Sequence, residues 1–357
     1  MKGMNIPMRV GGESMRPLCL EKERESFYSL MDEEKCYEML REARWPDGRV
    51  RCPYCGGEDI AGPWRSVHAP ECYRYRCRRC GRGFNDRTGT VFEGSKLPLR
   101  AWFLAIYLVQ LNHATAEIAR ELPCDYHTAH RIVWLIRERE MQIEEGRQLQ
   151  GVVEVDEIYQ TAGHKGQAPR GEARSLGRSP RRRGKKRGRG RGSAAKDAPA
   201  LIGMVSREGK MVLEVAPDVR RESLAPLFEK AVKRGSTIYT DSASCYRFLP
   251  EEGYTHASVN HSRREYARGP VHVNRAEALW SLWRPFIATF RGVAQRNLPA
   301  YARIFQFRRN HRHLNAFGRL YLITSLAVQN APRPFLHLRR FLDLLFSRRM
   351  FVSPIPI

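Results

Sequence analysis

The stretch VVEVDEIY, from Val152 to Tyr159, constrains the fold most, because it joins a β-strand pattern to three acids. Its β-branched and aromatic residues favour a largely buried strand. A buried carboxylate is costly unless a cation or hydrogen bonds compensate it. The sequence therefore predicts compensating partners for Glu154, Asp156 and Glu157.

The composition indicates a globular and strongly basic protein. Its 357 residues, 42% of them hydrophobic, suffice for two or three domains with a real core. The formal charge is +24, and removing every Lys and Arg between Arg178 and Arg191 still leaves the chain strongly basic. Such a charge favours a polyanionic partner, most simply nucleic acid.

No segment predicts export or a membrane partner. The N-terminal residues 1–17 lack an apolar core of signal-peptide length. The longest clean apolar stretch, Trp102 to Leu111, is far shorter than the about 20 residues that span a bilayer. We therefore expect a cytoplasmic protein.

Clustered cysteines predict a zinc ribbon. Two Cys-x-x-Cys pairs, each followed by Gly, have the spacing of a structural site in which four thiolates surround one Zn²⁺. The four predicted ligands are Cys52, Cys55, Cys77 and Cys80. Cys72 and His68 lie between the pairs and are alternative ligands, but we interpret them as bystanders. Four unligated cysteines would not explain the paired spacing.

Two short amphipathic helices are predicted after the ribbon and after an apolar helix from about Leu99 to Leu111. They cover Thr115 to Leu122 and His127 to Arg137, with a tight turn between them. This pattern suits a helix-turn-helix whose second helix enters the major groove, with an ordinary helical hairpin as the alternative. The candidate DNA contacts are His127, Thr128, His130 and Arg131.

The segment Gly163 to Lys196 contains Gly, Arg, Lys and Ser with hardly an apolar residue, so it cannot bury enough surface to fold alone. We interpret it as a basic loop that lies along phosphates, with a plain solvated loop as the alternative. Its candidate DNA-binding residues are Arg181, Arg182, Arg183, Lys185, Lys186 and Arg187.

The chain around this loop predicts an α/β domain. After the first strand the patterns indicate a hairpin, a helix, a strand, a short helix, another strand and a helix, which is the order of an RNase H-like fold. The expected elements are 201–206 with 211–215, 221–234, 237–240, a short helix carrying Tyr246 and Phe248, 254–259, and a helix with Asn274 as N-cap and Glu277 in its first turn. Helices at 299–315, 316–330 and Phe335 to Phe346 would follow.

These patterns divide the chain into five expected parts. The parts are an N-terminal helical segment (1–48), the zinc ribbon (49–92), the helix-turn-helix region (93–148), the RNase H-like domain (149–315, with the basic insertion 163–198) and a C-terminal helical tail (316–357).

Three acids occupy neighbouring places in the predicted domain. Asp156 lies on the first strand, Asp241 ends a later strand, and Glu277 lies in the following helix. In an RNase H-like sheet these strands are adjacent, and the helix can lay its carboxylate over their ends. Carboxylates suit Mg²⁺ or Mn²⁺, and two such ions about 4 Å apart can cleave or join a phosphodiester. Each acid alone could be a turn former or helix cap, but their joint order disfavours that reading.

Several motifs resemble one known family. They are GTVFEGSKLPLRAW, VEVDEIY, GMVSREGKMVLEVAPDVRRESL, IYTDSASCY and HVNRAEALWSLW. They are similar to the DDE transposases of bacterial insertion sequences, in the subgroup with an N-terminal zinc ribbon, over about Phe27 to Asn315. The resemblance implies metal-dependent cleavage at terminal inverted repeats and strand transfer into target DNA. It also implies a nucleoid-associated bacterial protein that acts on DNA as a dimer or higher oligomer.

The resemblance carries Asp156 and Asp241 over as the first two catalytic acids. The third position stays open between Asn274 and Glu277, which share a helical face. We favour Glu277, because a carboxylate binds Mg²⁺ better than a neutral amide. Arg284 stands where the family commonly has a basic residue and could hold a phosphate, although Pro285 is expected to kink or end the helix there.

Four residues near the acids are interpreted as support. Glu154 shares strand parity with Asp156, whereas Glu157 points to the other face, and we expect both to be supporting or ion-paired residues. Trp280 and Trp283 are expected to pack the helix on the sheet, with base stacking as the alternative.

Two rival functions use many of the same features. A DNA-binding regulator derived from a transposase would need the basic surface and the ribbon but no intact metal site. An RNase H-like nuclease or resolvase would cut DNA without joining ends.

Overall fold

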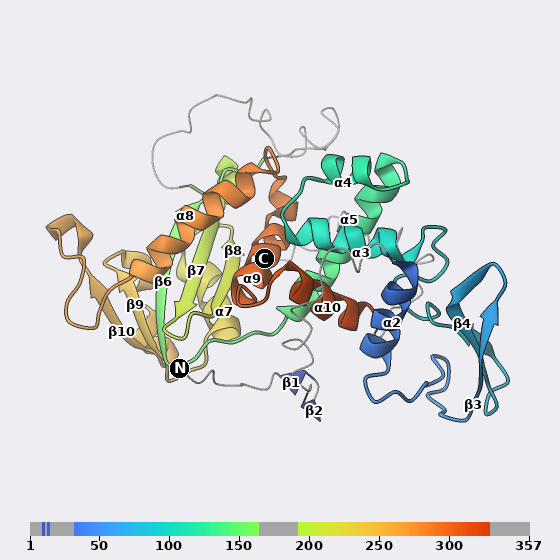
Figure 1. Ribbon diagram of the computed structural model, residues 1–357. Coiled ribbons are helices and arrows are strands. Elements are labelled where there is room, and N and C mark those ends of the chain that lie inside the picture. The colour runs from blue at the N-terminus through green and yellow to red at the C-terminus, as the bar shows by residue number, and fades with distance from the viewer. Residues whose placement is uncertain (1–8, 11–12, 15–31, 164–191, 329–357) are drawn as a thin grey trace, which may run out of the picture. The chain divides into compact units, whose positions relative to one another are not determined.

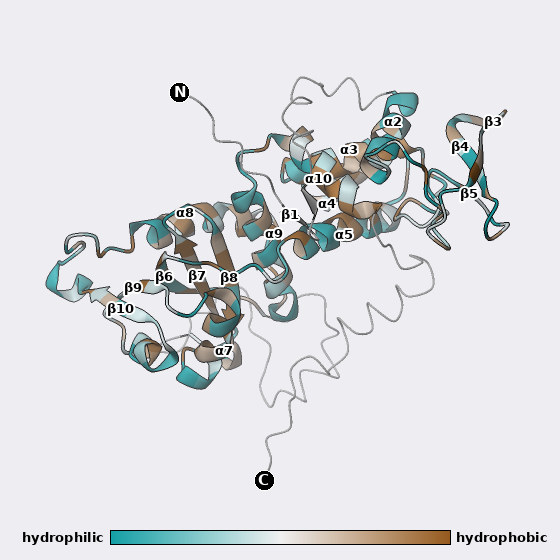
Figure 2. Cartoon of the chain, turned by 90° about the horizontal axis from the view of Figure 1, so that it is seen from below, coloured by the Kyte–Doolittle hydropathy of each residue, from teal (hydrophilic) through white to brown (hydrophobic). Residues whose placement is uncertain are grey.

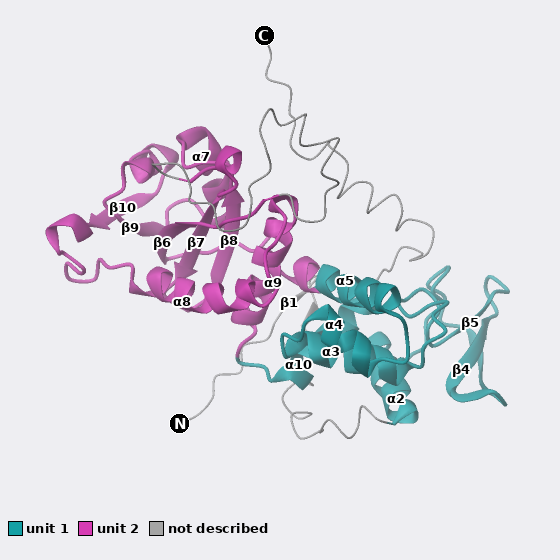
Figure 3. Ribbon diagram, turned by 90° about the horizontal axis from the view of Figure 1, so that it is seen from above, with its two compact units in different colours: residues 1–139, 313–357 teal, residues 140–312 magenta. Residues whose placement is uncertain are grey.

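The computed structural model describes residues 9–10, 13–14, 32–163 and 192–328 (Figure 1). They fall into two compact units, residues 1–139 with 313–357 and residues 140–312 (Figure 3). The predicted C-terminal helix at Phe335 to Phe346 and the candidate DNA-binding residues of the basic loop, Arg181 to Arg187, lie outside the described residues.

The N-terminal helix of unit 1 is α2 (Glu33–Arg44), which follows the short strands β1 (Arg9–Val10) and β2 (Glu13–Ser14). Asp32 caps α2, because its carboxylate accepts the backbone N–H of Glu34 at 2.9 Å. The sequence pattern of this helix begins near Ser26, and its residues before Asp32 lie outside the described residues.

The predicted zinc ribbon contains an antiparallel sheet of β3 (Ile60–Ser66), β4 (Ala69–Cys77) and β5 (Gly83–Asn85). The buried carboxylate of Asp86 ties this sheet to α2. It accepts hydrogen bonds from Arg41 Nη1 at 2.9 Å, the Tyr75 hydroxyl at 3.0 Å and the Tyr73 N–H at 2.8 Å. The buried Asp86 carboxylate therefore links the ribbon to α2 through hydrogen bonds.

The remaining helices of unit 1 are α3 (Leu99–Gln110), α4 (Thr115–Glu121), α5 (Tyr126–Ile143, whose last residues belong to unit 2) and α10 (Ala316–Ala327). Helix α10 packs against α3 and α2, so it joins unit 1 although we expected it in a C-terminal tail. The Glu33 carboxylate accepts the N–H groups of Leu99 and Arg100, at 2.6 and 2.9 Å, which connects α2 to the start of α3.

Unit 2 is built on a five-stranded sheet of order β10-β9-β6-β7-β8. Its strands are β6 (Val152–Tyr159), β7 (Ala200–Ser206), β8 (Met211–Ala216), β9 (Thr237–Asp241) and β10 (Thr255–Val259). Strands β6, β9 and β10 are parallel, whereas β7 runs antiparallel to β6 and β8. The predicted first strand and hairpin are confirmed.

Helices cover both faces of this sheet. Helix α7 (Arg221–Ala231) lies on one face, and α8 (Asn274–Ala288) and α9 (Leu298–Asn310) lie on the other (Figure 3). The central strands are largely hydrophobic (Figure 2). Along β6 the alternation sends Val153 and Val155 into the core beneath α7, while Glu154 and Asp156 face α8. The two acids therefore lie between sheet and helix.

Helix α8 differs from its prediction at both ends. It begins at Asn274 with Val273 as the cap residue, and Val273 is buried and offers no polar side chain. It continues through Pro285 to Ala288, because a proline in the last turn removes a single backbone hydrogen bond. The prediction that the helix begins after Asn274 was wrong by one residue. Of the two alternatives predicted for Pro285, an end of the helix at Arg284 was wrong, and a kink there stays a prediction.

Short 3-10 turns connect the strands and helices of unit 2. They are Ala194–Lys196, Ser244–Tyr246, Leu249–Glu252, His261–Arg263 and Gln295–Asn297. The predicted short helix around Tyr246 is therefore a pair of such turns.

The apolar stretch Trp102 to Leu111 lies mostly within α3. Among the described residues, none of the helices is long and apolar enough to cross a membrane.

Candidate functional site

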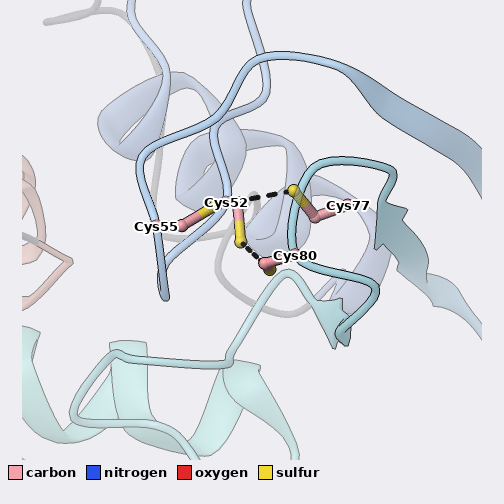
Figure 4. Close-up of side chains that lie close together, drawn as sticks. All are labelled: Cys52, Cys55, Cys77 and Cys80. Atoms are coloured by element: carbon pink, nitrogen blue, oxygen red, sulfur yellow. Dashed lines mark hydrogen bonds between the residues drawn. The ribbon is translucent and has the colours of Figure 1, made fainter.

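The four predicted zinc ligands meet in one cluster (Figure 4). The Sγ atoms of Cys52 and Cys80 are 3.7 Å apart, those of Cys55 and Cys77 are 3.6 Å apart, and all four lie within 4.8 Å of one another. A tetrahedral site with Zn–S bonds of about 2.3 Å has sulfur-sulfur distances of about 3.8 Å. The cluster therefore fits one structural Zn²⁺.

Both cysteine pairs lie on the same kind of turn. The N–H of Gly56 donates to the Cys52 carbonyl and that of Gly81 to the Cys77 carbonyl, each at 2.9 Å. Both glycines have positive φ, 69° and 73°, which a residue with a Cβ adopts at a cost. The glycine after each pair is thus part of the ligand turn.

The two alternative ligands lie outside the cluster. Cys72 is buried elsewhere in the ribbon, and that burial raises the pKa of its thiol. His68 is exposed in the turn between β3 and β4. Neither belongs to the group of converging ligand atoms, which agrees with their interpretation as bystanders.

Asp156 and Asp241 lie on neighbouring parallel strands. Glu154 on β6 is in register with Tyr239 on β9, so the next residues on the same side of each strand are Asp156 and Asp241. Both acids are half-buried. A parallel pairing places the carboxyl ends of both strands at one edge of the sheet, and both side chains lie there.

The pKa of Asp156 reports the charges around this carboxylate. Burial raises this pKa above its ordinary value, and the charges of Asp241 and Glu277 raise it further. Hydrogen bonds from the Trp280 indole and the Glu157 N–H oppose the shift. Repelling carboxylates at one place form a donor set suited to a hard divalent cation.

These carboxylates are more widely spaced than the ribbon thiols. Among the described residues, the four cysteines are the only group of three or more metal-ligating side chains whose ligand atoms all lie within 4.8 Å of one another. Mg²⁺ usually keeps several waters and takes only one or two carboxylates, so it does not need a closed set of protein ligands. The acids fit such an open site.

The three candidates on α8 differ in their surroundings. The charge of Glu277 raises the pKa of Asp156. Oε1 of Glu277 lies 3.5 Å from Nδ1 of His261. Asn274 and Arg284 are exposed, and within the described part of the chain no polar contact joins either to the acids. Of the three, Glu277 is the one that adds a negative charge to the surroundings of Asp156.

Two residues that support Asp156 were not recognised as such from the sequence. The Trp280 indole N–H donates to Asp156 Oδ2 at 2.8 Å. Gly203 on β7 is in register with Asp156, and a Cβ there would lie 2.7 Å from Leu279 and 2.8 Å from Trp280. A glycine inside a strand is the sequence signal for such a close approach. The expected packing of Trp280 and Trp283 on the sheet is confirmed by their burial.

The first turn of α5 presents part of the predicted DNA-contact set. Asp125 caps this helix by accepting the N–H groups of His127 and Thr128, at 2.8 and 3.0 Å, and the Thr128 hydroxyl at 2.7 Å. His127 and His130 are exposed, whereas Thr128 and Arg131 are half-buried. Tyr126, which is 50% exposed, adds an aromatic ring that the sequence prediction omitted.

The ribbon has a second candidate surface, its open sheet face. Arg74 and Arg76 alternate with the buried Tyr75 and Cys77 on β4, and the 51% exposed Trp64 pairs with Arg74 across the sheet. No carboxylate of the described residues lies within ion-pair distance of either arginine. The alternation in CYRYRC signals this face, but we did not include it in the predicted DNA-binding set.

Comparison with known proteins adds to this geometry. Residues 148–310 match the ISXO2-like transposase domain, and residues 31–83 match the transposase zinc-ribbon domain. A protein from Halobacterium salinarum, described as an uncharacterized protein in transposable element ISH50, is 34% identical over 288 residues, which is 79% of this chain and 92% of that protein. An uncharacterized transposase-like protein from Haemophilus influenzae is 24% identical over 107 residues, 30% of this chain and 86% of that protein.

A four-cysteine ribbon and an acid-bearing α/β unit that match these two domains define a transposase. The chain belongs to the family that combines an N-terminal transposase zinc ribbon with an ISXO2-like transposase domain. The family predicted from the sequence motifs is thereby confirmed.

Proposed function

We propose that this protein is a DDE-type transposase that binds the terminal inverted repeats of its element and cuts and joins DNA by metal-dependent phosphoryl transfer. The observation that carries the proposal is the gathering of acids from three elements around Asp156 at one end of the sheet. The charges of Asp241 on β9 and Glu277 on α8 both raise the pKa of Asp156 on β6. Acids gathered in this way need a cation to offset their repulsion.

An RNase H-like fold for unit 2 is part of this proposal. The first strand of the unit, β6, lies between β9 and the β7-β8 hairpin. Helix α8 lies over β6 and β7 on the face that carries Asp156. This arrangement supports the RNase H-like assignment expected from the order of elements.

Each acid has a role in the proposal. Asp156 and Asp241 hold divalent cations, with Glu277 as the third ligand and Arg284 as a phosphate contact. Bound cations supply activation of a water or 3′-hydroxyl and stabilisation of the leaving oxygen. The indole of Trp280 holds one oxygen of Asp156, and the Glu157 N–H holds the other at 2.9 Å, so the carboxylate is oriented before DNA arrives.

DNA binding is assigned to unit 1 and to the basic insertion. The open ribbon face and the first turn of α5 both present cationic or aromatic side chains. The insertion residues Arg181 to Arg187 lie outside the described residues and contribute by charge alone. Two element ends must be brought together, so we expect at least a dimer on DNA.

A strand-transfer assay on inverted-repeat DNA tests the proposal. Wild-type protein should nick and join ends with Mg²⁺ or Mn²⁺, and Asp156→Ala and Asp241→Ala should each abolish both steps while DNA binding persists. Wild-type transfer by either variant would refute the catalytic assignment. Binding without any nick would indicate a regulator, and cutting without joining would indicate a nuclease.

The third ligand is tested separately. Glu277→Ala should lose transfer about as completely as the two aspartate variants, whereas Asn274→Ala should retain most of it. The reverse result would assign the third position to Asn274.

A further inference from the structure

Helix α8 lacks a capping side chain of its own. Its cap residue, Val273, packs with Tyr239 and Val259 and cannot accept a hydrogen bond through its side chain. The backbone N–H of Arg275, the second residue of the helix, instead donates to Oε2 of Glu154 at 2.7 Å. Glu154 on β6 thus accepts a free backbone N–H of the first turn of α8, which is the usual role of an N-cap side chain.

Glu154 is fully buried, and its other oxygen lies beside Arg207 and His272. Oε1 lies 3.1 Å from Arg207 Nε and 3.6 Å from His272 Nδ1, contacts between charged or ionisable groups without hydrogen-bond alignment. Arg207 also donates to His272 Nε2 at 2.8 Å and to the Pro270 carbonyl at 2.7 Å. The cluster therefore binds β6, the β7-β8 turn and the segment before α8 to one carboxylate.

A buried ionic cluster of this kind is weak evidence for stability, because apolar residues often replace such clusters without loss. The cluster instead fixes the position of the start of α8 relative to β6. Glu154 lies two residues before Asp156 on the same face of β6, and Arg275 lies two residues before Glu277 on α8. The bond from Arg275 to Glu154 thus links the two elements that carry the first and third acids, beside the bond from Trp280 to Asp156 further along α8.

We propose that Glu154 is a positioning residue that sets the distance between Asp156 and the first turn of α8, and with it the affinity of the site for divalent metal. This inference rests on the proposed function. Glu154 is not itself a ligand, because its carboxylate is buried and one oxygen is held by the Arg275 amide.

Two variants separate the hydrogen bond from the charge. Glu154→Gln keeps an oxygen for the Arg275 N–H, whereas Glu154→Ala removes it. Glu214→Ala is the matched control, since Glu214 is an ion-paired acid whose partners, Lys230 and Arg303, lie on α7 and α9. All three are compared as full-length proteins with unchanged binding to inverted-repeat DNA.

The first measurement does not depend on catalysis. Hydrogen exchange, followed by mass spectrometry on a peptide spanning residues 272–279, reports the opening of the first turn of α8. We expect Glu154→Ala to exchange at least about tenfold faster there, Glu154→Gln to stay near wild type, and Glu214→Ala to leave this peptide unchanged.

The second measurement is the Mg²⁺ concentration for half-maximal strand transfer. We expect it to rise about tenfold in Glu154→Ala, to be partly restored by Mn²⁺, and to change less than about threefold in Glu154→Gln and Glu214→Ala. A purely structural role would loosen the whole of unit 2 without moving the Mg²⁺ midpoint.

Wild-type exchange in Glu154→Ala, or a Mg²⁺ midpoint equal to that of wild type, would overturn the inference. If Glu154→Ala does not fold, Glu154→Met takes its place, because methionine fills similar space and offers no oxygen to the Arg275 N–H: faster exchange at residues 272–279 and a raised midpoint in it support the role, and wild-type values overturn it. If the wild-type protein never joins ends, the proposed function fails, and the exchange measurement still decides whether Glu154 anchors α8.

Discussion

The indole N–H of Trp280 donates a 2.8 Å hydrogen bond to Oδ2 of Asp156, and it does so from the helix that also carries Glu277. The same ring lies against Gly203, the residue in register with Asp156 on β7. A tryptophan in van der Waals contact with a glycine therefore orients the first proposed catalytic acid.

Replacing Trp280 by Phe should slow strand transfer by about 10- to 100-fold, because a hydrogen bond to a charged group contributes about 1.5–3 kcal/mol. The measurement is the initial rate at saturating DNA and Mg²⁺. Trp283→Phe is the control, since its indole donates to Gln160 at 2.8 Å and touches no proposed ligand. Equal rates for the two variants would show that the hydrogen bond from Trp280 to Asp156 does not contribute to the rate of strand transfer.

Replacing Gly203 by Ala should destabilise unit 2 by about 1–3 kcal/mol, the usual cost of inserting a methyl group into a packed core. Thermal unfolding measures the loss. Gly163→Ala is the control, because a Cβ there meets nothing within 4 Å. A melting temperature unchanged by Gly203→Ala would contradict the close packing of α8 on β7.

Asp156→Asn should stabilise the metal-free protein at neutral pH. Burial raises the folded-state pKa of Asp156, so its ionisation opposes folding. This destabilisation is fully present above the folded-state pKa, fades as the pH falls through it, and is absent below the ordinary value of 3.8.

Unfolding in chelator at several pH values tests this. The melting temperature of Asp156→Asn should exceed that of wild type at pH 7, and the difference should vanish near pH 3. Added Mg²⁺ should raise the melting temperature of the wild type only. A variant less stable than wild type at pH 7 would contradict the pKa argument.

Replacing any one of the four cysteine ligands should cause the protein to lose its bound zinc. Cys77→Ser should reduce the zinc content from about one ion per chain to a small fraction, because three thiolates bind Zn²⁺ far less tightly than four. Metal analysis of purified protein is the measurement. Cys72→Ser is the control and should retain its zinc, and loss of zinc from it would assign Cys72 to the site.

Replacing Arg74 and Arg76 by Ala should weaken DNA binding across all sequences. If each arginine contacts a phosphate, the slope of log affinity against log salt should fall by about 1 for each. Fluorescence anisotropy over a salt series measures the slope. Arg51→Ala is the control, since Arg51 already pairs with Asp47 and Glu58, and an equal effect from it would argue against a specific face.

The sequence supported the prediction of unit 2 because its signals are local. The alternation of β6, the β7-β8 hairpin and the acids of β6 and β9 each depend on neighbours along the chain. The family, the cysteine cluster and the burial of Trp280 and Trp283 agree with their predictions. The roles of Asp156, Asp241 and Glu277 stay predictions.

The missed features depend on contacts between distant segments. No local pattern indicates that Glu154 accepts the N–H of Arg275, or that Trp280 bonds Asp156, because each pair is separated by more than a hundred residues. The cap of α8 was placed on Asn274 for the same reason, since a capping residue was sought next to the helix and the acceptor lies on β6.

The packing of α10 on α2 and α3 means that unit 2 interrupts unit 1 in the chain. A fragment ending after Arg139 would lack Ala316–Ala327 and leave α2 and α3 with an uncovered apolar surface. Residues 140–312, by contrast, form one uninterrupted piece. A premature stop codon shortly after residue 312 would therefore remove part of the zinc-ribbon unit and leave the acid-bearing unit whole. This holds although the ribbon is translated first.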